Sequence, residues 1–201
     1  MSEGELTPAV GAADHSTGGA APRITLVEYG DFQCPYCGMA YPILERIRRR
    51  MGSEMRFVFR HFPLGQIHPQ ARHAAEAAES AGAQGKFWAM HDALFENQGA
   101  LDDASLVHYA ALIGIDGEAI ERDLEAGTWT KKVRDDFRSG VRSGVNGTPT
   151  FFIDGRRYDG PWADERRFRE ALEAAATGPS AIRADSRSAS RSEPPSAGAG
   201  R

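Results

Sequence analysis

The sequence is poor in cysteine, in positive charge and in long apolar segments. Its 201 residues include two cysteines, 24 lysines and arginines, and 28 aspartates and glutamates, which gives a formal net charge of −4. Two cysteines are too few for the disulfide framework of a small secreted scaffold, and a slightly acidic chain lacks the clustered positive charge that nucleic-acid backbones require. No run approaches the ~20 apolar residues that cross a bilayer. We therefore expect one soluble globular domain that binds neither nucleic acid nor membrane.

The start of the chain also lacks the marks of a secretory signal. Residues 1–21 contain no lysine or arginine and no apolar stretch, whereas such a signal has a basic start and an apolar centre of roughly 7–15 residues. The prediction is a cytoplasmic protein, or a periplasmic one only if Met1 is not the native start.

Both ends of the chain have the composition of unstructured segments. Residues 1–21 are rich in Gly, Ala, Ser and Thr, and residues 178–201 contain Ile182 as their single large apolar residue. Such segments bury too little apolar surface to offset the entropy of ordering, so we expect disordered ends around a folded domain at 22–177. The serine–arginine spacing of the tail could instead suggest an RNA-binding segment, but it has two acids against four arginines and no aromatic residue.

The folded part alternates strand and helix signals. Clusters of β-branched, aromatic and other apolar residues predict strands at 24–29 and 55–62, and apolar residues recurring every three or four positions predict a helix at 35–50 between them. Helical segments punctuated by glycines fill 69–143. Two short strands, 150–153 and 156–158, flank an Asp-Gly hairpin signal, and a helix at 163–176 closes the domain. A strand–helix–strand order favours a parallel pair, so the sequence indicates an α/β fold with a helical block inside it.

Both cysteines lie in one motif, Cys34-Pro35-Tyr36-Cys37, between the first predicted strand and the first helix. Two side chains three positions apart in a first helical turn share one face and are close enough for a disulfide. The free N–H groups and the dipole at a helix start favour a thiolate, so Cys34 is expected to be the exposed nucleophile. Cys37 begins the buried stripe of the helix and would resolve a mixed disulfide by attacking the Cys34 sulfur.

Three other interpretations of the pair are weaker. Half a zinc site needs more ligands, and the next histidines, His61, His68 and His73, lie too far along the chain for finger spacing. Two merely buried hydrophobic residues would not need this spacing at a helix start. A static disulfide closes too short a loop to stabilise much and is disfavoured in a reducing cytoplasm. The sequence therefore predicts a redox-active pair, with no metal, nucleotide or flavin, because the cysteines themselves carry the two electrons.

Two further features accompany the motif. Glu28 lies within the otherwise apolar strand, six residues before Cys34; if buried there it would have a raised pKa and could relay a proton for Cys37. A salt bridge to an arginine, or a position at a wet strand end, would account for it equally well. Thr148-Pro149 precedes a strand, and because proline there leaves an open edge, an extended substrate segment could pair with the backbone of Thr148.

Taken in order, these motifs resemble the DsbA-like thiol-disulfide oxidoreductases of the thioredoxin superfamily. The matching segments span about 14–177 and are Asp14-His15, Ala21-Pro22, Val27-Glu28-Tyr29-Gly30-Asp31-Phe32-Gln33 before the cysteines, Phe59-Arg60-His61-Phe62-Pro63-Leu64, Gly85-Lys86-Phe87-Trp88, Leu94-Phe95 and Gly147-Thr148-Pro149-Thr150-Phe151-Phe152. The resemblance implies a thioredoxin fold with an all-helical domain inserted at about 65–145. It also implies a cis peptide bond at Pro149 facing the cysteines and a buried acid at Glu28 near the resolving thiol.

The dipeptide between the cysteines departs from the best-known periplasmic members, which have His where this chain has Tyr36. Since Pro35 and Tyr36 tune thiolate stability, this difference and the missing signal argue against a strongly oxidising role. The same dipeptide occurs in glutaredoxins, but the long helical insert does not suit that family.

The expected function is thiol-disulfide exchange with a disulfide-containing protein or a low-molecular-weight thiol, reset by a separate recycling redox partner. One alternative is a glutathione-dependent isomerase or transferase on the same fold, which the intact second cysteine disfavours. The other is a redox-switched binding or chaperone module. The direction of electron flow, the natural substrate and the oligomeric state do not follow from the sequence.

Overall fold

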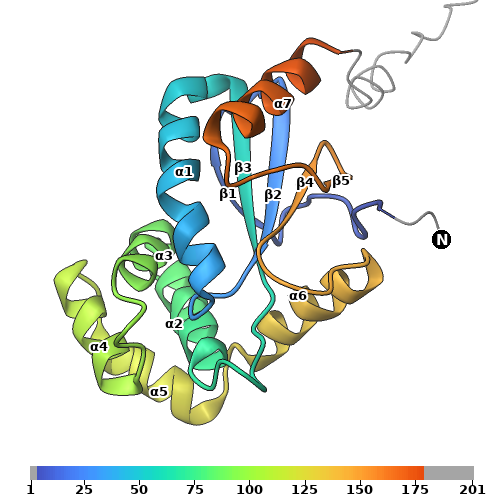
Figure 1. The fold of residues 1–201 in the computed structure, drawn as a ribbon. Helices are drawn as coiled ribbons and strands as arrows, with labels where there is room; N and C mark the ends of the chain where they lie inside the picture. The colour runs from blue at the N-terminus through green and yellow to red at the C-terminus, as the bar shows by residue number, and fades with distance from the viewer. Residues whose placement is uncertain (1–3, 179–201) are drawn as a thin grey trace, which may run out of the picture.

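Apolar, β-branched and aromatic residues build the centre of a five-stranded sheet in this computed structural model, which describes residues 4–178 (Figure 1). The strand order is β1-β3-β2-β4-β5, with β1 at His15–Gly18, β2 at Ile24–Gly30, β3 at Met55–His61, β4 at Thr150–Ile153 and β5 at Arg156–Tyr158. The β2–β3 pair is parallel because α1 (Pro35–Met51) crosses between them, and the other pairs are antiparallel. β2 is buried along its whole length, as expected of a central strand.

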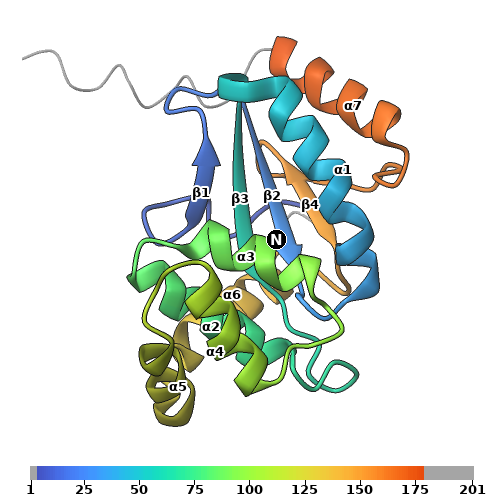
Figure 2. The same ribbon diagram turned by 90° about the vertical axis from the view of Figure 1, so that its left-hand side faces the viewer.

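A block of helices is inserted between β3 and β4 and lies beyond the end of the sheet where β2 and β3 finish (Figures 1 and 2). It consists of α2 (Ala71–Ala83), α3 (Phe87–Glu96), α4 (Asp103–Leu112), α5 (Gly117–Ala126) and α6 (Thr130–Arg142). The last helix, α7 (Glu165–Thr177), packs beside α1. The predicted α/β thioredoxin fold with a helical insertion is thus confirmed. None of the helices within 4–178 has the length and apolar character needed to cross a membrane.

The alternation of side chains along β2 divides the core into two parts. Leu26 faces a large cluster shared with α1, α3 and α7, whereas Val27 and Tyr29 face a smaller cluster on the opposite side of the sheet. Leu6 and Val10, from the chain before β1, pack against this smaller cluster, as does Phe137 of α6.

The prediction that residues 1–21 are disordered is wrong for residues 4–21. β1 pairs antiparallel with β3 along four residues, and Asp14 accepts hydrogen bonds of 2.7 and 3.0 Å from the buried Arg60 guanidinium. The segment needs no core of its own, because it covers a sheet face that already exists and pairs with a buried charge. Of the tail predicted to be disordered, residues 179–201 lie outside the described part of the chain.

Candidate functional site

The two cysteines lie where the chain leaves β2 and enters α1. Cys34 is the N-cap of α1, with extended backbone angles (φ −72°, ψ 123°), and Pro35 occupies the first turn, where its missing N–H costs nothing. No side chain caps this helix end. The first N–H groups are therefore left for the Cys34 sulfur, which accepts hydrogen bonds from the backbone of Tyr36 and Cys37.

Both cysteines are free thiols, and both are buried. Cys37 is fully buried, as predicted, but Cys34 is only 3% exposed, so the expectation of an exposed nucleophile is wrong. The cause is the loop before β4: the Cys34 thiol lies 3.4 Å from the main-chain oxygen of Thr148. The Thr148–Pro149 peptide bond is cis. The side chain that stands out at the surface is Tyr36, which is 59% exposed.

The pKa values of the two thiols diverge. The Cys37 thiol, which donates a hydrogen bond to the Cys34 sulfur, and the hydrogen bonds from Thr148 and the helix start lower the pKa of Cys34 to about 5. Burial raises the pKa of Cys37 well above its usual value, and the negative charges of Glu28 and Cys34 add to that rise. At neutral pH the pair therefore consists of one thiolate and one thiol. Thiol–disulfide exchange requires such a pair, because a thiolate attacks first and a second thiol later resolves the mixed disulfide.

Glu28 lies on the face of β2 that faces α1 and is 1% exposed. Burial, with a contribution from the Cys34 charge, raises the pKa of this carboxyl to about 8, against the opposing effect of a hydrogen bond with Cys37. No arginine or lysine among residues 4–178 forms an ion pair with it, and Oε1 has no hydrogen-bond partner there. Of the interpretations left open by the sequence, the structure places Glu28 as a buried acid beside the Cys37 thiol.

Asp31 fixes the loop that carries Cys34. Its main-chain oxygen accepts a 3.0 Å hydrogen bond from the Cys34 N–H, and its buried carboxylate accepts hydrogen bonds from the N–H groups of Gln33 and Leu64 at 2.8 and 2.9 Å. The ring nitrogen Nδ1 of His68 lies 2.7 Å from the same carboxylate. The loop after β3 and the loop after β2 are therefore held together next to the cysteines.

Gln98, in the turn after α3, is a site residue that the sequence analysis missed. Its side-chain amide donates hydrogen bonds to the main-chain oxygens of Phe32 and Cys34, at 2.8 and 2.9 Å. Gly38 makes room for it, because a Cβ at Gly38 would lie 2.0 Å from the Gln98 Oε1. The small residue at position 38 was the signal in the sequence, but its partner lies 60 residues away and belongs to no motif.

His61 does not join the thiols. Its Nε2 lies 2.8 Å from the Glu79 carboxylate, and His15 lies 2.9 Å from the other oxygen of that group. His61, Glu79 and Asp136 each bring one potential metal-ligand atom to within 4.8 Å of the others. However, the Lys132 ammonium lies 2.7 Å from Asp136 and 3.5 Å from Glu79 and already supplies the positive charge. This group is a buried ion-pair network that joins β1 and β3 to the helical insert.

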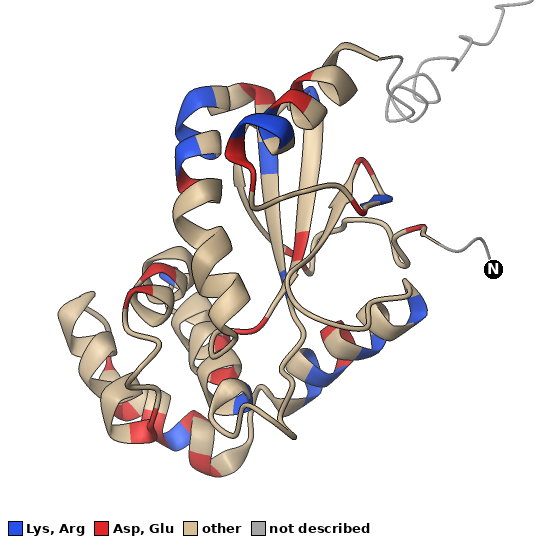
Figure 3. Cartoon of the chain, in the orientation of Figure 1, with Lys and Arg blue, Asp and Glu red and all other residues tan. Residues whose placement is uncertain are grey.

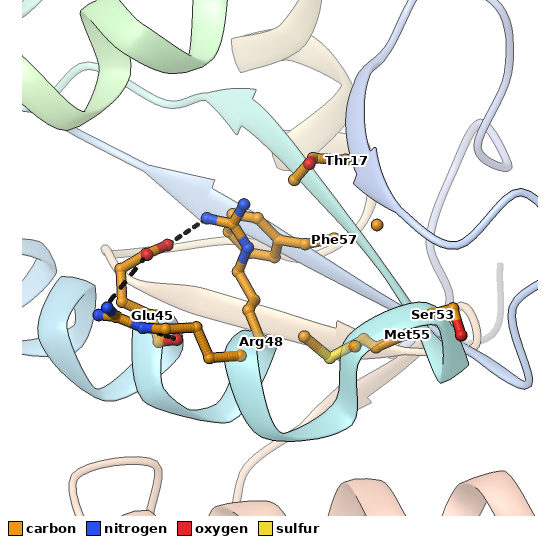
Figure 4. Close-up of a pocket in the computed structure, with 9 residues that line it drawn as sticks. Thr17, Glu45, Arg48, Ser53, Met55 and Phe57 are labelled. Atoms are coloured by element: carbon orange, nitrogen blue, oxygen red, sulfur yellow. Dashed lines mark hydrogen bonds and ion pairs between the residues drawn. The ribbon is translucent and has the colours of Figure 1, made fainter.

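A hollow lies at the opposite end of α1 from the cysteines (Figure 4). Arg48 lies over the rings of Phe57 and Trp88 at 5.3 Å and forms an ion pair with Glu45, which also pairs with Arg49. Both arginines are thus paired with Glu45, and Arg48 also packs on two aromatic rings. The residues that line the hollow include no cysteine or histidine.

The chain is similar to a known protein family and to parts of several curated proteins. Residues 25–173 match the family model of the DSBA-like thioredoxin domain. Among curated proteins, the chain is 41% identical over 163 residues to the Na(+)/H(+) antiporter NhaA 1 of Mycobacterium sp. (strain KMS), and 43% identical over 164 residues to that of Salinispora arenicola. These matches cover 80% and 82% of this chain but 26% and 24% of the relatives, so the chain spans about a quarter of their length.

Solved structures share the fold. BdbD from Bacillus subtilis has a TM-score of 0.77 at 23% identity and matches 88% of this chain and 98% of its own. A thioredoxin-like oxidoreductase from Silicibacter pomeroyi has a TM-score of 0.74 at 27% identity, covering 84% and 95%. The catalytic domain of Proteus mirabilis ScsC has a TM-score of 0.71 at 20% identity, covering 86% and 93%. The neighbours below 25% identity establish the fold alone.

Proposed function

The chain belongs to the DSBA-like thioredoxin domain family, and on that premise we propose that it exchanges disulfides through Cys34 and Cys37. Proteins of this family use a redox-active disulfide in place of a bound cofactor. The observation that carries the proposal is the opposite shift of the two thiols: a pKa of about 5 for Cys34 and a raised pKa for Cys37.

In the reducing direction, the Cys34 thiolate attacks one sulfur of a substrate disulfide. A mixed disulfide forms, and the other substrate sulfur leaves as a thiolate. Cys37 then loses its proton to Glu28 and attacks the Cys34 sulfur, which releases the second substrate thiolate and forms the Cys34–Cys37 disulfide. Two electrons pass to the substrate, and a recycling dithiol restores the pair. The oxidising direction runs the same steps in reverse.

Thr148 and Pro149 are proposed to hold the substrate. The Thr148 oxygen already contacts the Cys34 thiol at 3.4 Å, so a substrate strand lying along this loop would place its sulfur against the nucleophile. A proline at the loop leaves no N–H of its own, which keeps the edge open for the incoming strand. Protein disulfides and small disulfides can both use this edge.

The antiporter activity named for the relatives is not proposed for this chain, because the match covers only about a quarter of their length. What we infer from those names is that the same thiol-exchange unit occurs inside longer polypeptides. The cytoplasmic location expected from the sequence stays a prediction.

The deciding measurement is the redox potential of the Cys34–Cys37 pair in defined glutathione buffers. A potential near −270 mV, about that of thioredoxin, would indicate a reductase, and one between about −180 and −120 mV an isomerase or oxidant. A pair that forms no disulfide at any glutathione ratio would overturn the proposal.

The Cys37→Ser variant separates this function from the two alternatives. A dithiol exchanger should accumulate as a mixed disulfide with its substrate, whereas a glutathione-dependent isomerase should continue to turn over. A redox-switched binding module predicts negligible turnover of model disulfides by the wild type as well.

A further inference from the structure

Exposed apolar side chains occur on the elements that carry the cysteine site and on the elements next to it. Five large apolar residues among 4–178 are more than half exposed. Tyr36 lies between the two cysteines and Met39 lies two residues after Cys37, whereas Ile67 and Val141 lie on the loop after β3 and on α6. The fifth, Leu112, lies at the end of α4. An exposed apolar residue beside an apolar hollow marks a candidate interaction surface, and Ile67 has such a place.

A hollow lies between the loop after β3 and α6. It is lined by Pro63, Leu64, Gly65, Gln66, Ile67 and Phe137. The Phe137 ring is held against Phe62, on which it stacks with 4.3 Å between centroids. A single apolar side chain of a partner would find apolar walls on both sides here.

Both walls of the hollow connect directly to the cysteine site. Leu64 donates its N–H to the Asp31 carboxylate at 2.9 Å, and the main chain of Asp31 binds the N–H of Cys34. On the other side, the chain that follows α6 runs through the buried Val145 to Thr148. A polypeptide whose disulfide lies at Cys34 can therefore extend from the thiolate into this hollow.

Unpaired cations line the same helix. Arg134, Arg138 and Arg142 recur every four residues on α6, are exposed, and have no carboxylate within 4 Å in the described part of the chain. Figure 3 shows basic residues along α6. Most other arginines between residues 4 and 178 are paired with an acid, for example Arg46 with Glu165 and Arg169 with Glu173. A row of unpaired guanidinium groups attracts carboxylates.

We propose that this α6 surface, made of Leu64, Ile67, Phe137, Arg134 and Arg138, receives an apolar segment with acidic flanks from the protein that carries the disulfide. The apolar residue fills the hollow and the acidic residues meet the arginines. The inference rests on the proposed thiol exchange and names the substrate class it favours: proteins whose exchanged cysteine lies near an apolar, acidic stretch.

The test compares two disulfide-linked peptides that share an apolar core and differ only in glutamate or lysine flanks. For the wild type we expect kcat/KM for the acidic peptide to exceed that for the basic one by about tenfold at low salt, with the difference shrinking in 0.5 M salt because of screening. The double variant Arg134→Glu, Arg138→Glu should invert the preference, and Ile67→Ser should lower kcat/KM for both peptides.

A matched control changes the same charge elsewhere. Arg50→Glu with Lys86→Glu replaces two exposed, unpaired cations that lie outside the α6 surface, and it should keep the wild-type ratio. Exchange with hydroxyethyl disulfide by the wild type tests the proposed function separately. If that exchange occurs but the wild type does not distinguish the two peptides, the inference is overturned. Loss of binding to phosphatidylglycerol vesicles in the double variant, with unchanged peptide ratios, would also overturn it in favour of a membrane surface.

Discussion

The side-chain amide of Gln98 donates hydrogen bonds to the main-chain oxygens of Cys34 and Phe32, at 2.9 and 2.8 Å. Gln98 belongs to the helical insert and Cys34 to the thioredoxin part of the chain, so the proposed nucleophile is held from both parts. Gly38 permits the contact, since any side chain there would overlap the amide. The insert therefore contributes to the geometry of the thiolate as well as to the bulk of the protein.

Replacing Gln98 by alanine should lower the free energy of unfolding by about 1–2 kcal/mol, because two buried carbonyls lose their donor. The loop should also loosen, which misaligns the N–H groups of Tyr36 and Cys37 and raises the pKa of Cys34. Urea unfolding and the pH dependence of alkylation measure the two effects. Gly38→Ala should reproduce both by displacing the amide.

Gln84→Ala serves as the control for this prediction. Gln84 also uses its side chain to bind backbone groups, those of Asp116, but on the exposed side of the insert. Its loss should cost less than about 1 kcal/mol and leave alkylation unchanged. An unaltered alkylation profile in both Gln98→Ala and Gly38→Ala would show that Gln98 does not position the thiolate.

Local patterns in the sequence were sufficient to predict the central fold. The cluster of β-branched, aromatic and other apolar residues in β2 and the three-to-four spacing of apolar residues in α1 are local signals, and a cysteine pair at a strand–helix junction has few chemical explanations. The burial of Cys34 was missed because it depends on the Thr148 loop, which lies 114 residues away. The order of residues 4–21 was missed for the same reason: composition counts a segment's own apolar residues and does not register that Asp14 meets Arg60.

The thiolate of Cys34 should persist to mildly acidic pH. With a pKa of about 5, the rate of alkylation by iodoacetamide should rise with a midpoint near pH 5 and be constant from pH 6 to 8, where Cys37 stays protonated. Because the pKa is lowered on folding, the reduced protein should gain stability from this group as pH rises from about 5 towards the unfolded value near 9.

The Cys37→Ala variant tests what lowers the pKa of Cys34. The Cys37 thiol is the largest contribution to the low pKa of Cys34, so its removal should move the alkylation midpoint upward. A wild-type midpoint above pH 8 would contradict the assignment of Cys34 as the nucleophile at neutral pH.

The N-terminal segment should contribute measurably to stability through Asp14. Asp14→Ala leaves the buried Arg60 guanidinium without its carboxylate, which should cost about 3 kcal/mol in urea unfolding. Glu54→Ala removes an exposed pair with Arg23 and should cost less than about 1 kcal/mol. Equal costs would mean that the segment is not docked as described.

The same pair should respond to acid. Burial alone would raise the pKa of Asp14, but the hydrogen bonds from Arg60 and Gly11 outweigh it and hold the pKa below its usual value. The stability that Asp14 supplies is therefore present above about pH 4 and is lost as pH falls below that. Asp14→Ala should be correspondingly less sensitive to acid than the wild type.

Glu28→Gln should slow resolution without slowing attack. The amide has nearly the same shape but cannot accept the Cys37 proton. The mixed disulfide with substrate should therefore live at least about tenfold longer, since a general base typically contributes about 10²–10⁴-fold to a rate. The amount of mixed disulfide can be followed over time by quenching samples with acid and analysing them by mass spectrometry. In the wild type, the resolution rate should rise with pH towards about 8, where Glu28 ionises, and this rise should be absent from the variant. Glu76→Gln, equally buried but bonded to Thr130 of the insert, should leave the lifetime unchanged.

As pH rises, the free energy of unfolding of the reduced wild type should fall relative to that of the reduced Glu28→Gln variant. Since folding raises the pKa of Glu28 from 4.5 to about 8, its favourable contribution is complete below pH 4.5 and is lost as pH rises to about 8. The wild type should therefore fall relative to the variant by up to about 4 kcal/mol across that interval. If the stabilities of the two proteins vary with pH in parallel, folding does not raise the pKa of Glu28 and its carboxylate is ionised at neutral pH. Glu28 would then be a weak base and would accept the Cys37 proton only weakly.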